Sequence, residues 1–169
     1  HFEARENQIT KVTPLAFNGT NLYTVDLVSN PLKEFPDLKV VSNTLTTVLF
    51  AGGNFTTFSF ANFTKLQVIF ATGCKITNIQ PDALMNTKVR RLGLNQNSIT
   101  QLPNIDSTKI YLELFNMDSN KVENITAEYF KDVPRLSEVK ISHNLLRDIH
   151  PTAFSGQREP GVNLMLRLE

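Results

Sequence analysis

The sequence predicts an α/β repeat solenoid, a curved stack of similar units that each add one short strand to a shared parallel sheet. Two observations support this fold class. Apolar residues recur in a fixed order with a period of about 23 residues. The fourth position of every recurrence is Asn, Gly or Cys. Self-similarity at roughly 20–50 residues is the signature of a repeat architecture.

The repeat is clearest in the stretch LQVIFATGCKITNI at residues 66–79, where six positions follow one another at spacings of 3, 2, 3, 2 and 3. The same spacing recurs in five further repeats, none of which has a charged residue at these positions. Their first residues are Leu22, Leu45, Val89, Leu112 and Leu136. We therefore expect a single domain over 1–169, with a partial repeat at 1–21, repeats starting near 22, 45, 66, 89, 112 and 136, and a broken repeat at 161–169.

Alternation within each repeat predicts the strand. In the apolar-x-apolar core of the unit, the two apolar side chains point one way and their neighbours point the other way. One repeat cannot bury its apolar side alone, so neighbouring repeats stack into a continuous core. The Asn position follows the strand, where a side-chain amide can satisfy backbone groups left unpaired by a sharp turn.

The pattern L-x-x-L-x-L-x-x-N/C-x-L resembles the leucine-rich repeat. The segments VTPLAF (12–17), IQPDAL (79–84) and IHPTAF (149–154), with the looser copies FSFANF (58–63) and ITAEYF (125–130), resemble the extracellular animal type found in Toll-like receptor ectodomains and small leucine-rich proteoglycans. The Gly-x-Ile-Pro segment of the plant receptor type is missing. The resemblance implies a right-handed solenoid with a parallel sheet on its concave face and irregular or short helical convex segments. Because Cys-rich end caps are missing, we expect a fragment of a longer protein.

Composition excludes several function classes. The 169 residues carry a formal net charge of +1, which gives no general electrostatic attraction to nucleic acid or to an anionic membrane. No run of eighteen apolar residues occurs, so no membrane-spanning segment is expected in this chain. The three histidines, His1, His143 and His150, are too scattered for a metal site. We expect no catalytic residue, metal or cofactor.

The only cysteine, Cys74, has two interpretations. A thiol among aliphatic residues packs as a small hydrophobic group. A catalytic thiol should instead be partly exposed beside positive charge. Cys74 occupies the Asn position of its repeat, which favours the structural interpretation.

Four N-glycosylation sequons are candidates for modification, and they begin at Asn18, Asn54, Asn62 and Asn124. None falls on a predicted outward strand position of the concave face, which glycans would therefore leave open. Since a sequon matters only in a secreted protein, we expect an extracellular chain, either secreted or part of an ectodomain. The alternative is a cytoplasmic repeat protein.

The outward strand positions between the repeat residues predict the binding site. They are polar at both ends of the solenoid and apolar in the middle. The candidate partner-binding residues are Val28, Leu49, Val68, Phe70, Arg91 and Leu114. Gly93, beside Phe70, should leave a dip in this surface. An apolar patch with a polar rim marks an interaction site more often than an accident.

These observations predict a non-enzymatic module that binds a protein or peptide through its concave face, and they favour no nucleic-acid partner. Two alternatives stay open: a structural spacer, and a carbohydrate-active enzyme on a parallel β-helix. The enzyme would need clustered carboxylates on adjacent strands, and only Glu3 and Asp26 are placed that way. The patch also allows a homodimer formed through the concave face.

Overall fold

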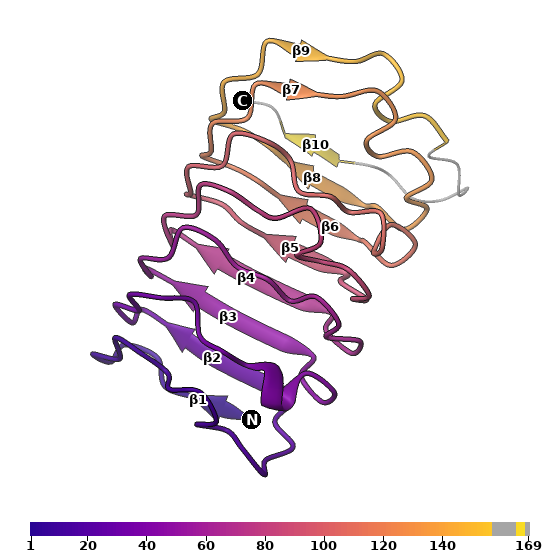
Figure 1. The fold of residues 1–169 in the computed structure, drawn as a ribbon. Helices are drawn as coiled ribbons and strands as arrows, with labels where there is room; N and C mark the ends of the chain where they lie inside the picture. The colour runs from indigo at the N-terminus through magenta and orange to yellow at the C-terminus, as the bar shows by residue number, and fades with distance from the viewer. Residues whose placement is uncertain (157–164, 168–169) are drawn as a thin grey trace.

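One parallel sheet of eight strands runs the length of the solenoid (Figure 1). The computed structural model describes residues 1–156 and 165–167. The strand order is β1-β2-β3-β4-β5-β6-β8-β10, so neighbours in space are also successive turns of the chain. The strands are β1 (Phe2–Glu3), β2 (Thr24–Val28), β3 (Thr47–Ala51), β4 (Val68–Thr72), β5 (Arg91–Gly93), β6 (Leu114–Asn116), β8 (Glu138–Lys140) and β10 (Met165–Arg167).

The register of the sheet confirms the predicted alignment of the repeats. Thr24 pairs with Thr47, Thr47 with Val68, and Val68 with Arg91. The alignment continues to β8, where Glu138 pairs with Leu114. The broken repeat expected at 161–169 lies outside the described residues except for β10, which pairs with β8.

The inward-facing residues of the strands form the core. Val25, Leu27, Val48 and Ile69 are fully buried, as the alternation of the repeat predicts. Because each repeat contributes only a few such side chains, the core becomes continuous through stacking of the turns.

A left-handed residue ends the strand segment of each turn. It precedes the Asn position and has a φ between 54° and 74°. These residues are Glu6, Ser29, Gly52, Gly73, Gln96, Ser119 and His143. The reversal leaves backbone groups without partners in the sheet, and the following Asn side chain satisfies them. Asn97, for example, accepts hydrogen bonds from the backbone N–H groups of Cys74 and Ile76 in the preceding turn, each at 3.0 Å.

The convex side is built from turns. Within the described residues, the only helical segment is the 3-10 turn η1 (Lys39–Val41). A second, two-stranded parallel sheet joins β7 (Asn124–Ile125) to β9 (Asp148–Ile149) near the C-terminal turns (Figure 1). The predicted irregular convex segments are thus confirmed, and helix is almost absent. No helix among the described residues has the length and apolar character needed to cross a membrane.

Two repeats lack the Pro-x-x-Ala-Phe segment, and the structure fills their convex sides differently. The repeat that starts at residue 22 places Leu38 and Val41 of the η1 region in the core. The repeat that starts at residue 89 buries Ile105 and Thr108 instead. Ser107, at the position where other repeats place Phe or Leu, is exposed.

Candidate partner-binding face

The outward side of the eight-stranded sheet, here called the concave face, brings all six predicted contact residues together across β2 to β6. Leu49 pairs in register with Phe70, and Arg91 lies between Val68 and Leu114. The five apolar residues of the set are half-buried, whereas their inward neighbours are fully buried. Each apolar side chain therefore retains surface that a partner would remove from water.

Phe70 and Gly93 are in direct contact, and this changes the predicted shape of the face. A Cβ atom built on Gly93 would lie 2.2 Å from Cδ1 and 2.6 Å from Cε1 of Phe70. The ring of Phe70 thus lies over the glycine, which is buried. The expectation of a dip at Gly93 was wrong, because the aromatic ring occupies that space. The Phe70 ring therefore forms an apolar surface that extends from β4 onto β5.

Arg91 is the polar member of the set. It is exposed, and its guanidinium makes no hydrogen bond or ion pair with any residue that the structure describes. Its sequence neighbour Arg90 is different, since its Nε donates to Oε1 of Glu113 at 2.9 Å. The Arg91 guanidinium, which keeps all its donors, is therefore available to an external acceptor.

The N-terminal end of the concave face is held by an ion pair. Asp26 is 1% exposed, and its Oδ2 accepts hydrogen bonds from Arg5 at 2.7 Å (Nε) and 2.6 Å (Nη2). Its Oδ1 accepts a hydrogen bond from the backbone N–H of Val28 at 3.2 Å. The hydrogen bond to Asp26 raises the pKa of Arg5 above its ordinary value. The Asp26 carboxylate is thus occupied by structural partners and not presented to a substrate.

Cys74 is fully buried, and its Sγ donates to the carbonyl oxygen of Thr72 at 3.4 Å. Burial raises the pKa of the thiol to about 11. A thiol with this pKa is protonated at neutral pH and lacks the exposure that a nucleophile needs. The geometry therefore supports the structural interpretation. Residues 1–156 and 165–167 also contain no cluster of three or more His, Cys, Asp or Glu side chains that could hold a metal ion.

The four sequon asparagines, Asn18, Asn54, Asn62 and Asn124, are all exposed. None lies on a strand of the eight-stranded sheet; Asn124 belongs to β7. Asn62 Oδ1 accepts a hydrogen bond from Asn86 Nδ2 at 2.8 Å, which leaves its own amide nitrogen available. All four amides are therefore sterically open to modification.

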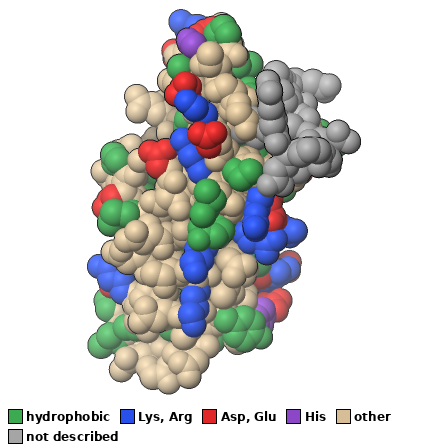
Figure 2. Space-filling view, turned by 90° about the vertical axis from the view of Figure 1, so that its right-hand side faces the viewer, with side chains coloured by type: hydrophobic (Ala, Val, Ile, Leu, Met, Phe, Trp, Pro, Cys, Tyr) green, Lys and Arg blue, Asp and Glu red, His purple; other side chains and the backbone are tan. Residues whose placement is uncertain are grey.

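Charge along the edge where the main strands begin is mixed. Figure 2 shows Lys and Arg side chains interspersed with Asp and Glu along this edge. Several of the basic groups near this edge are paired, including Arg90 with Glu113 and Lys109 with Asp106. On this face, the described basic side chains alternate with acidic ones and do not form the uniform positive stripe that tracks a phosphate backbone.

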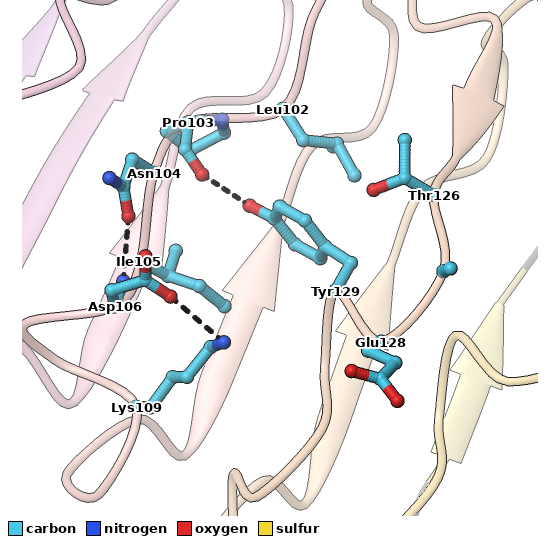
Figure 3. Close-up of a pocket in the computed structure, with 10 residues that line it drawn as sticks. Leu102, Pro103, Asn104, Ile105, Asp106, Lys109, Thr126, Glu128 and Tyr129 are labelled. Atoms are coloured by element: carbon cyan, nitrogen blue, oxygen red, sulfur yellow. Dashed lines mark hydrogen bonds and ion pairs between the residues drawn. The ribbon is translucent and has the colours of Figure 1, made fainter.

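Sequence reasoning missed a groove on the convex side. Cavities of about 330 and 360 Å³ adjoin each other there and share Leu102, Thr126 and Tyr129 as lining residues. Figure 3 shows Tyr129 pointing toward Pro103. The Tyr129 hydroxyl donates a hydrogen bond to the carbonyl oxygen of Pro103 at 2.5 Å. Burial raises the pKa of Tyr129 well above its ordinary value.

A solenoid with one parallel strand per turn, and with an Asn side chain that bridges neighbouring turns after most strands, is typical of one class of repeat protein. The family model for the leucine-rich repeat matches residues 110–159. Residues 110–159 thus carry leucine-rich repeats, and the same repeat pattern and parallel sheet continue along the rest of the described chain.

Three relatives resemble the chain in sequence. Receptor-like protein 41 from Arabidopsis thaliana is 31% identical over 64% of the chain and 12% of its own length. Decorin from Canis lupus familiaris is 34% identical over 60% of the chain and 29% of its length. Osteomodulin from Bos taurus is 28% identical over 88% of the chain and 42% of its length. The chain thus spans less than half the length of the curated relatives it matches.

Among solved structures, TLR13 from the TLR13–ssRNA13 complex superimposes with a TM-score of 0.72, covering 95% of this chain and 23% of that chain. The sequence identity is 20%, so the similarity establishes the fold alone.

Proposed function

We propose that the chain is a non-enzymatic recognition module of a secreted protein or receptor ectodomain, and that it binds a protein or peptide through the concave face. The observation that carries this proposal is the half-buried apolar patch over β2 to β6, with Arg91 unpaired beside it. Aromatic and Arg side chains surrounded by a polar rim are typical of binding hot spots.

The apolar patch can contribute part of the binding free energy of a partner. Full burial of one large apolar side chain contributes about 1.5–3 kcal/mol. Micromolar binding requires about 8 kcal/mol. Because Phe70, Leu49, Val68 and Leu114 are already half-buried, completing their burial supplies only part of that free energy, and polar contacts such as those of Arg91 must add to it.

The extracellular location rests on separate observations. Four sequons are exposed and none lies on the eight-stranded sheet, and one of the relatives is named a receptor-like protein. Two groups that an enzyme could use are not available in the described part of the chain, because Asp26 is engaged by Arg5 and Cys74 is buried.

Site-specific photocrosslinking tests the proposal. A benzoylphenylalanine placed at Thr47, on the border of the patch, should crosslink the full natural chain to one partner in the medium of cells that express it. The same group at Leu15, which is 62% exposed on the convex side, should not. Phe70→Asp combined with Leu49→Asp should remove the Thr47 crosslink without unfolding the protein.

A matched control uses Leu15→Asp combined with Leu145→Asp, because both leucines are more than half exposed and lie outside the concave face. This variant should retain the crosslink. A crosslink to a second copy of the chain would identify a homodimer. A crosslink that persists in the folded Phe70/Leu49 double variant, or no crosslink at Thr47, would reject concave-face recognition and favour a spacer.

A further inference from the structure

The open groove on the convex side lies directly beside one sequon. Asn124 lines the cavity of about 360 Å³ together with Thr100, Gln101, Leu102, Thr126 and Tyr129. The volume falls within the range of about 300–1,000 Å³ that is typical of small-molecule sites. Asn18, Asn54 and Asn62 line none of the cavities described above. Asn124 is therefore distinguished from the other sequons by what lies next to it.

The chemistry of the groove suits a sugar. Leu102 and Tyr129 supply apolar wall, and both are half-buried. Thr100, Gln101 and Thr126 are exposed, and their side chains make no hydrogen bond with any other residue in the described part of the chain. A pyranose ring presents C–H groups on its faces and hydroxyl groups around its edge, so it can use both kinds of wall. The adjoining cavity adds the Asp106–Lys109 ion pair at 2.9 Å (Figure 3).

We propose that Asn124 carries an N-linked glycan and that its first N-acetylglucosamine residues lie in this groove, against Leu102 and Tyr129. The inference rests on the proposed extracellular location, since only a chain that enters the secretory pathway is modified at sequons.

Covalent attachment makes weak contacts sufficient. A sugar linked to Asn124 experiences a high effective concentration at the groove, of millimolar order for short flexible linkers. Contacts far too weak to capture a free sugar can therefore hold the attached one.

Enzymatic release of the glycan provides the test. The full natural chain is expressed in animal cells, and mass spectrometry of glycopeptides measures occupancy at each sequon. Peptide N-glycosidase is then applied to the folded protein. Release at Asn124 should be at least about tenfold slower than at Asn54, the exposed control sequon, and the two rates should become equal after denaturation; this tenfold ratio corresponds to about 1.4 kcal/mol of protection.

Groove variants separate sugar contacts from the backbone rigidity of β7. Thr100→Ala combined with Gln101→Ala changes two exposed side chains and keeps the sequon, so the fold should persist. Leu102→Ser removes apolar wall. Both changes should accelerate native-state release at Asn124 and leave release at Asn54 unchanged. In addition, Asn124→Gln should lower Tm by about 2–4 °C, whereas Asn54→Gln should not, because loss of roughly 1 kcal/mol shifts Tm by this amount in a chain of this size.

Failure of the groove-bound glycan can be distinguished from failure of the proposed extracellular location. A natural chain that never reaches the secretory pathway refutes the extracellular location and with it this inference. A secreted chain with Asn124 unoccupied, or with equal native release at Asn124 and Asn54, refutes the groove-bound glycan alone. Slow release that the groove variants do not alter also refutes it, because rigidity of β7 then explains the protection.

Discussion

At the residue scale, the Asn side chains after the strands are the main polar connectors between turns. Asn97 accepts from two backbone N–H groups of the preceding turn, and its Nδ2 lies within 2.7 Å of the carbonyl oxygen of Ala71 and 2.8 Å of that of Leu94. Each group left unsatisfied in the interior costs about 1–3 kcal/mol. One side chain thus satisfies several groups in an otherwise apolar core.

Asn97→Ala should therefore lower the free energy of unfolding by at least about 3 kcal/mol, because several buried backbone groups lose their partners together. Asn7→Ala provides the matched control. Asn7 occupies the same repeat position but is exposed and donates only to the carbonyl oxygen of Arg5, so its loss should cost about 0.5 kcal/mol or less. Urea denaturation of both variants measures the difference. Equal losses would contradict the role assigned to the buried amide.

At the element scale, β4 and β5 are coupled through the contact of Phe70 with Gly93. The glycine is needed here for close approach: any side chain at position 93 would collide with the aromatic ring. The apolar surface that Phe70 forms on the concave face therefore depends on both β4 and β5.

Gly93→Ala should destabilise the protein by about 1–3 kcal/mol, because the ring of Phe70 must leave its position to admit the Cβ atom. In the background of Phe70→Ala the same change should cost much less. A double-mutant cycle in urea should give a coupling energy above about 1 kcal/mol. Additive effects, within about 0.5 kcal/mol, would show that the ring does not depend on the glycine.

The strands and their faces followed from the sequence, whereas these contacts between elements did not. Alternation assigns Leu27 to the core and Phe70 to the outer face because successive side chains of a strand point in opposite directions. Alternation says nothing about the side-chain torsions that lay the Phe70 ring over Gly93. The convex groove also escaped prediction, since the filling by Ile105 and Thr108 depends on packing between turns that have no regular period. The assignment of Phe70 and Arg91 to a binding site is still a prediction.

At the scale of the whole molecule, two different devices join the turns. Asn97, Asn120 and Asn144 connect the C-terminal turns through side-chain hydrogen bonds. The series is interrupted at Gly53 and Cys74, which occupy the Asn position of two successive repeats. An aromatic cluster lies behind this interruption. Phe60 is 1% exposed, and its ring centroid is 5.1 Å from that of Phe35 in the preceding repeat and 5.3 Å from that of Phe63.

Stability in a solenoid is approximately a sum of repeat terms and nearest-neighbour interface terms. Phe60→Ala should remove about 3–5 kcal/mol from the interface that lacks an Asn bridge. The turns N-terminal to this interface, which Asn30 bridges to each other, should then unfold before the turns C-terminal to it. The chain contains no Trp, so Phe17→Trp and Phe154→Trp can report separately on the two ends by fluorescence. Without Phe60→Ala the two reporters should share one urea midpoint; with it, the midpoint at position 17 should fall well below that at position 154. Coincident midpoints in both backgrounds would show that the aromatic cluster is not the weak interface of the solenoid.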